Sequence, residues 1–89
     1  MIVEWDGQAL DRLADIYVAL TPAEREVVVR CVERTTARLH IDPGFIGESR
    51  GGNRRVWFNR PLMVVYDLPR GGGVLVVHVA FVGNDTDDS

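Results

Sequence analysis

The sequence predicts an α+β fold in which a hairpin of two helices packs on a small antiparallel sheet, in the order β-α-α-β-β-β. Three observations lead to this prediction. Apolar residues recur at helical spacing in the first half of the chain, apolar and alternating runs fill the second half, and glycine and proline separate the segments. With 89 residues and 46% hydrophobic content, the chain suits one compact domain and leaves no room for a second.

A short strand and a first helix account for the start of the chain. Residues 2–5 alternate apolar and mixed positions, and Asp6-Gly7 follows as a helix start. Asp6 is the expected N-cap, because its carboxylate can accept hydrogen bonds from the free N–H groups of the first turn. Apolar side chains then recur at helical spacing and predict one amphipathic helix. These positions are Leu10, Leu13, Ala14, Tyr17 and Leu20.

The segment Thr21-Pro22-Ala23-Glu24 marks the start of a second helix. It combines a capping threonine, a proline at the first helical position and a glutamate three residues after the cap. The helix should run to about Leu39. Because no linker separates the two helices, we expect an antiparallel hairpin. The expected buried face of the second helix consists of Val28, Cys31, Val32, Thr35 and Leu39.

The second half of the chain predicts a loop and three strands. Asp42-Pro43-Gly44 ends the helical pattern, because proline restricts the residue before it and glycine tolerates turn dihedrals. A loop should run from there to Gly52. The predicted strands are 54–59, 62–68 and 74–82, and residues 69–73 connect the last two as a hairpin loop.

The last predicted strand, residues 74–82, is apolar on both faces, so we expect it inside the sheet. The first strand can pair beside it or at the far side of the sheet, and periodicity leaves both open. The predicted domain is residues 1–83. Residues 84–89 hold three aspartates and no apolar side chain, which predicts a disordered acidic tail.

The composition predicts a soluble, cytoplasmic protein that needs no metal or cofactor and has no membrane partner. Cys31 is the only cysteine, so an internal disulfide is excluded and the ligands of a thiolate metal site are lacking. The first residues lack the basic start and apolar stretch of a signal peptide, and no apolar run reaches the roughly 18 residues of a membrane span.

The net charge of −3 argues against nucleic-acid binding through bulk positive charge. The distribution of the charges along the chain carries more information. All ten basic residues are arginine. Arg50, Arg54, Arg55 and Arg60 fall in one glycine-containing stretch with a single acid, Glu48. Arginine forks fit phosphate groups bidentately, which favours a phosphate-binding patch. The alternative is a surface ion pair of Glu48 with one arginine while the others are solvated.

The order of elements resembles that of the RelE/ParE toxin superfamily. The phrases Gly47-Glu48-Ser49-Arg50, Arg54-Arg55-Val56 and Pro61-Leu62-Met63-Val64-Val65-Tyr66 are similar to family motifs, and the resemblance covers about residues 2–82. It implies the toxin of a type II toxin–antitoxin system, neutralised by a cognate antitoxin protein. It also implies one of two activities, or an inactive module that only binds an antitoxin.

The first implied activity is a metal-independent endoribonuclease, an mRNA interferase that drives a 2′-hydroxyl against the adjacent phosphate of ribosome-bound mRNA. The resemblance assigns the phosphate-stabilising position to Arg54 or Arg55 and an acid/base role to Glu48. The arginine-rich stretch itself predicts Arg50 and Arg60 as further phosphate or RNA contacts. The family's active nucleases follow the last strand with a glycine, then histidine or arginine, and a terminal tyrosine. This chain continues from Gly83 into Asn84-Asp85, so those residues are missing.

The second implied activity is inhibition of DNA gyrase by binding, as in the ParE-like branch, which needs no catalytic residues. The absence of the nuclease residues after Gly83 is compatible with this branch. Two other proton-exchanging residues, His78 and Tyr66, are interpreted as core residues rather than as substitutes. The prediction places His78 on the strand face of Val74, Val76 and Ala80.

An antitoxin-binding surface is predicted on the second helix. Arg30, Arg34 and Arg38 recur every four residues and therefore share one stripe. Such a row can dock an acidic or amphipathic segment that folds on binding, or it can be a solvated helix face. Trp57, in a strand with one exposed face, is a further contact candidate, because aromatic residues and arginines anchor interfaces.

Overall fold

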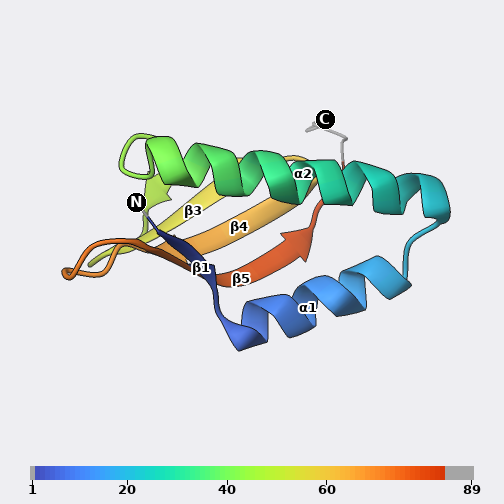
Figure 1. The fold of residues 1–89 in the computed structure, drawn as a ribbon, viewed down its shortest axis with the longest axis horizontal. Coiled ribbons are helices and arrows are strands. Elements are labelled where there is room, and N and C mark those ends of the chain that lie inside the picture. Colours follow the sequence, from blue (N-terminus) through green and yellow to red (C-terminus); the bar gives the residue numbers. More distant parts are fainter. Residues whose placement is uncertain (1, 84–89) are drawn as a thin grey trace.

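The computed structural model describes residues 2–83 and has the predicted α+β class, with two helices packed against one sheet (Figure 1). The acidic tail predicted for residues 84–89 lies outside the described residues. The elements are β1 (Val3–Trp5), α1 (Gly7–Val18), α2 (Pro22–Ile41), β2 (Glu48–Ser49), β3 (Arg54–Asn59), β4 (Leu62–Asp67) and β5 (Val74–Phe81). Of the helices in residues 2–83, none is long and apolar enough to cross a membrane.

The sheet has five strands in the order β1-β5-β4-β3-β2 and is mixed. The apolar β5 lies inside it, as predicted. The predicted order of elements is confirmed, with the short β2 added inside the predicted loop. The prediction of an entirely antiparallel sheet is wrong at β1, which pairs with β5 in parallel, with Val3 opposite Val74. A parallel partner becomes possible because α1, α2 and three strands separate β1 from β5 and allow the chain to return in the same direction.

Both helix starts have the predicted caps. The Asp6 carboxylate accepts a hydrogen bond from the Gln8 N–H at 3.2 Å. The Thr21 hydroxyl accepts from the Glu24 N–H at 3.2 Å, and the Glu24 carboxylate accepts from the Thr21 N–H at 2.9 Å. Local hydrogen bonds therefore begin both helices where the sequence indicates.

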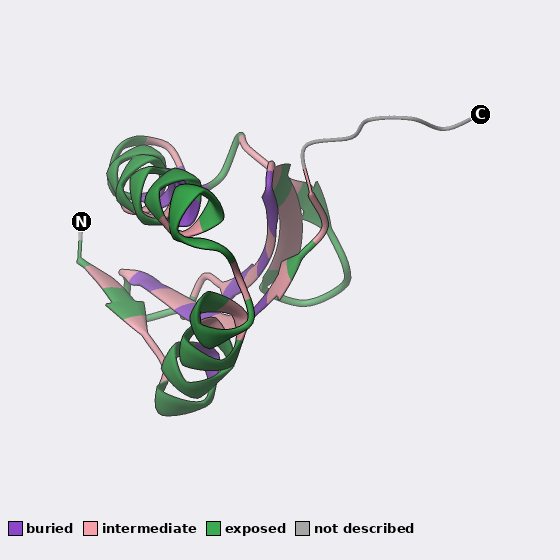
Figure 2. Cartoon of the chain, turned by 90° about the vertical axis from the view of Figure 1, so that its right-hand side faces the viewer, coloured by how far each residue is buried: buried purple, intermediate pink, exposed green. Residues whose placement is uncertain are grey.

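The two helices meet at their connection and then diverge, so they form an open V rather than a closely packed hairpin (Figure 1). The Arg25 guanidinium joins them near the vertex by donating to the carbonyl groups of Tyr17 and Val18. Farther from the vertex, β1 lies between them, and α1 packs along β5 while α2 covers a face of the sheet (Figures 1 and 2). The sheet therefore provides most of the contacts that hold the helices.

The core lies between α2 and the sheet, with a contribution from α1 (Figure 2). Four of the five positions predicted for α2 are fully buried, and Val32 is half-buried. On α1 the buried face is centred on Ala9 and not on Leu10, which is 50% exposed; Tyr17 is 40% exposed. The buried apolar residues are Ala9, Val28, Cys31, Leu39, Leu62, Val64, Tyr66, Val74, Val76 and Val79.

A β-bulge in β5 changes which of its side chains face α2. The pairing with β4 shifts between Val65 and Tyr66, so Tyr66 lies opposite Val76 whereas Val65 lies opposite His78. An extra residue in one strand reverses the alternation beyond it. His78 therefore shares its face with Ala80 but not with Val74 and Val76, so the predicted strand face is wrong for these two valines. Val79 takes the buried position instead.

Candidate functional site

The glycine-containing arginine stretch forms a β-hairpin, with β2 and β3 joined by a tight turn. The Arg50 N–H donates to the Arg54 carbonyl at 2.8 Å, and the Arg54 N–H donates to the Gly51 carbonyl at 3.1 Å. Gly51 and Gly52 both have positive φ, at 97° and 56°, which favours glycine at these positions. The glycines thus shape the turn that brings Arg50 beside Arg54.

Arg54 and Arg55 lie on opposite faces of the sheet. Arg55 pairs with the buried Tyr66, and Arg54 pairs with Asp67. Neighbouring residues of a strand point to opposite faces. A phosphate group bound on one face of the sheet can therefore contact only one of these two guanidinium groups.

The Arg54 guanidinium forms a two-pronged ion pair with Asp67. Its Nε donates to the Oδ1 atom of Asp67 at 2.8 Å, and its terminal Nη2 donates to the Oδ2 atom at 3.0 Å. The hydrogen bonds from Arg54 lower the pKa of the Asp67 carboxyl group below its usual value. A phosphate group that binds Arg54 must compete with this carboxylate.

Arg55 holds the loop between α2 and β2. Its guanidinium donates to the carbonyl groups of Ile46 at 3.3 Å and Gly47 at 3.0 Å. The Tyr66 hydroxyl, which is buried beside it, donates toward the carbonyl of Pro43. Burial raises the pKa of Tyr66, and the positive charge of Arg55 partly opposes this rise. The interpretation of Tyr66 as a core residue agrees with this position.

Glu48 lies on the face of Arg54, because it pairs with Val56, which follows Arg54 at the strand period of two. Its carboxylate accepts a hydrogen bond from Arg50 at 3.1 Å, and both side chains are exposed. This exposed pair is the ion pair that the sequence allowed as an alternative. The structure thus brings Glu48, Arg50 and Arg54 to one face and leaves Arg55 on the other.

Arg60 lies at the far end of β3 from this cluster, in the turn before β4. Its guanidinium donates to the Gly83 carbonyl at 3.2 Å and lies 6.0 Å from the centre of the Phe58 ring. Arg34 of α2 donates to the Arg60 carbonyl at 3.3 Å. The sequence grouped Arg60 with the other three arginines, but strand β3 separates it from them.

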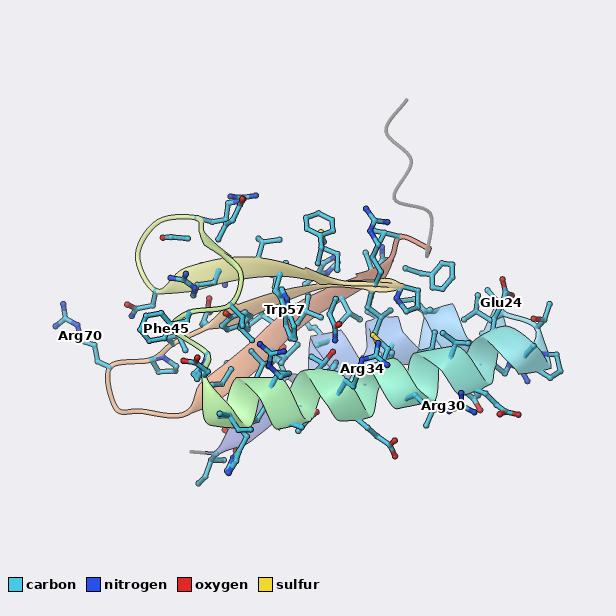
Figure 3. All side chains as sticks on the ribbon, turned by 90° about the horizontal axis from the view of Figure 1, so that it is seen from above. Glu24, Arg30, Arg34, Phe45, Trp57 and Arg70 are labelled. Atoms are coloured by element: carbon cyan, nitrogen blue, oxygen red, sulfur yellow. The ribbon has the colours of Figure 1, made fainter. Side chains whose placement is uncertain are left out.

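The predicted antitoxin contacts lie on α2 and on the side of β3 that faces it (Figure 3). Arg30 pairs with Glu26 at 3.3 Å, and Arg38 is exposed. The guanidinium of Arg34 is hydrogen-bonded to the carbonyl of Arg60 in the turn between β3 and β4. Trp57 is half-buried against the core. The row is accessible to a partner, although Arg30 and Arg34 already have contacts within the chain.

Among residues 2–83, no group of three or more histidine, cysteine, aspartate or glutamate side chains is placed so that it could hold a metal ion. Cys31 is buried, and its sulfur atom lies 3.0 Å from the Asn59 carbonyl. The sequence missed two roles, the pairing of Asp67 with Arg54 and the loop contacts of Arg55. Strand alternation signalled the opposite faces of Arg54 and Arg55, but their partners depend on the register between strands.

Comparison with known proteins supports the fold. No protein-family model and no curated protein matches the chain. Among solved structures, a chain of the chromosomal ParDE TA system from P. aeruginosa matches 92% of this chain and 96% of its own length, with a TM-score of 0.70 and 19% sequence identity. The chain therefore has the RelE/ParE-like fold that the resemblance in the sequence implied.

Proposed function

We propose that the chain is the toxin of a type II toxin–antitoxin pair and that it acts by binding its target, with DNA gyrase as the expected target. The fold supports the first part of this proposal, because the matched chain belongs to a ParDE TA system. That match also supports a cognate antitoxin as a protein partner of this chain. The exposed arginines of α2 offer positive charge to an acidic antitoxin segment.

The separation of Arg54 from Arg55 favours binding over RNA cleavage. Attack of a 2′-hydroxyl on the adjacent phosphate needs a base, a cation for the developing charge and an acid around one phosphate group. Here Arg55 holds a loop on one face, while Arg54 is bound to Asp67 on the other. Inhibition by binding requires no such convergence.

The second candidate is the metal-independent endoribonuclease. One observation favours it, namely that Glu48, Arg50 and Arg54 lie on the same face of the sheet. In this mechanism Glu48 would take the proton of the 2′-hydroxyl, Arg54 would release Asp67 to bind the phosphate, and the leaving 5′ oxygen would take its proton from water. Arg55 would then have no direct role in the reaction.

The test measures both activities of the same chain. After brief induction in bacteria, primer extension on a translated mRNA reports cleavage, and supercoiling by gyrase in the presence of purified chain reports inhibition. Binding to gyrase predicts growth arrest, inhibited supercoiling and no new mRNA ends. Co-expression of the neighbouring reading frame should restore growth if it encodes the antitoxin.

Three single variants separate the two candidates. Arg54→Ala tests the exposed cluster, Arg55→Ala tests the loop anchor, and Arg70→Ala is a matched control at the exposed tip of the β4–β5 loop (Figure 3). New mRNA ends that disappear in Arg54→Ala but persist in Arg70→Ala would establish the endoribonuclease and contradict inhibition by binding alone.

A further inference from the structure

The outer edge of β1 has backbone groups available for another strand. The Ile2 carbonyl accepts from the Val74 N–H at 2.8 Å, and the Asp6 N–H donates to the Val76 carbonyl at 2.8 Å. In a parallel pair, alternate residues bond the neighbouring strand. The N–H and C=O groups of Val3 and Trp5 therefore face away from β5. Within residues 2–83, β1 is the last strand on this side of the sheet.

An apolar groove adjoins this edge on the side of α2. Its walls come from β1 and from the last turns of α2, and its polar members are Glu33, Thr36 and His40. Two of its lining residues, Ile2 and Ile41, are 73% and 75% exposed. The apolar lining residues are Ile2, Val3, Val32, Ala37 and Ile41. A strand paired with β1 would direct every second side chain toward this groove, because side chains alternate between the two faces.

Charge at the edge selects which strand can bind. Val3 and Trp5 point toward α2, as the bond from the Trp5 indole to the Thr36 hydroxyl shows, so the exposed Glu4 points to the other face. A basic side chain opposite Glu4 stabilises cross-strand pairing, and an acidic one destabilises it. Glu33 adds a second carboxylate beside the groove.

The same charge disfavours a second copy of this chain as the occupant. An antiparallel pair of two β1 strands that uses the N–H and C=O groups of both Val3 and Trp5 is centred on Glu4, so the two copies of Glu4 lie opposite each other. Like charges in this position destabilise the pair. Exposed edges are commonly protected in this way from self-association.

We propose that the edge of β1 and the adjoining groove form a docking site for an extended segment of a partner protein, in which apolar residues alternate with lysine or arginine. The segment adds a sixth strand beside β1, its apolar side chains fill the groove along α2, and its basic side chains lie opposite Glu4. This site is separate from the row of Arg30, Arg34 and Arg38 on α2 and from the exposed cluster of Glu48, Arg50 and Arg54. Its test does not depend on the proposed toxin function.

The test uses the full chain and short synthetic peptides, followed by NMR. One peptide alternates valine with lysine, a second replaces each lysine by glutamate, and a third contains the residues of the first in shuffled order. The first peptide should slow hydrogen exchange at the Val3 and Trp5 amides and bind about twofold to tenfold more tightly than the glutamate peptide. The shuffled peptide should not slow exchange at these amides.

Variants of the chain give independent readouts. Glu4→Lys should reverse the preference between the lysine and glutamate peptides. Ile41→Ser should weaken binding of the lysine peptide, whereas Phe45→Ser should leave it unchanged, because Phe45 is 87% exposed and lies outside the groove. Val3→Pro should abolish binding, since it removes an N–H group that faces away from β5.

Three results would overturn the proposal: no binding of the lysine peptide, equal binding of the shuffled peptide, or binding without slowed exchange at Val3 and Trp5. An unchanged preference in Glu4→Lys would remove the charge argument and with it the assigned occupant.

Discussion

The buried hydroxyl group of Tyr66 lies 2.7 Å from the backbone carbonyl oxygen of Pro43 and links the centre of the sheet to the loop that follows α2. The same hydroxyl also reaches the carbonyl of Ile46, to which Arg55 donates from β3. Two side chains from neighbouring strands thus bind the backbone of one loop. The position of this loop fixes where β2 joins the sheet.

Replacing Tyr66 by phenylalanine should test this link. Tyr66→Phe keeps the ring but leaves buried carbonyl groups with fewer donors, which should lower the free energy of unfolding by about 1–3 kcal/mol. Urea unfolding measures the loss. Tyr17→Phe is the matched control at an exposed tyrosine and should change stability little. Equal stability of both variants would contradict an anchoring role for the Tyr66 hydroxyl.

Gly47 should not tolerate a side chain. Its φ is +79°, and a Cβ atom there would lie 2.8 Å from the Val56 carbonyl oxygen. Gly47→Ala should therefore cost at least about 1–2 kcal/mol from the left-handed backbone alone. The control is Gly71→Ala, where a Cβ atom meets nothing within 4 Å. Thermal or urea unfolding of both variants checks this, and a stable Gly47→Ala protein would show that the loop can move.

The ion pair of Asp67 with Arg54 should make part of the stability depend on pH. The folded state lowers the pKa of Asp67, so the stabilisation is fully present above the unfolded pKa of about 3.9 and is lost as the pH falls through the lower folded-state pKa. Asp67→Asn should therefore be less stable than the natural chain at neutral pH. The urea midpoints of the natural chain and of Asp67→Asn, measured from pH 7 down to about pH 2, should converge, because protonated Asp67 no longer pairs with Arg54 as an anion. A constant difference at every pH would contradict this assignment.

The capping box of α2 should contribute measurably to stability. Thr21→Ala removes the hydroxyl that accepts from the Glu24 N–H and should cost about 0.5–2 kcal/mol. Thr21→Ser retains an accepting hydroxyl and should lose much less. Circular dichroism during urea unfolding compares the two. A loss of equal size in both variants would point to the methyl group rather than to the cap.

The sequence predicted the features that depend on short-range interactions. Thr21 and Glu24 are three residues apart, and their reciprocal hydrogen bonds form within one helical turn. The buried face of α2 followed from the helical period in the same way. The alternation that separates Arg54 from Arg55 was also present in the strand pattern, although their partners, Asp67 and the Ile46 and Gly47 carbonyls, were not.

Only the tertiary structure decided the features that join distant segments. The parallel pairing of β1 with β5 brings Val3 beside Val74, and nothing in a three-residue strand specifies that partner. The bulge in β5 moves His78 to the other face, because one extra residue reverses the alternation that the sequence pattern assumes. The sequence by itself determined every element except the short β2, and the order of these elements, through local hydrogen bonding and hydrophobic period. The register, the position of β1 at the edge of the described sheet and the partners of Arg54 and Arg55 were decided by pairing between strands, whose energy depends on contacts across the whole chain.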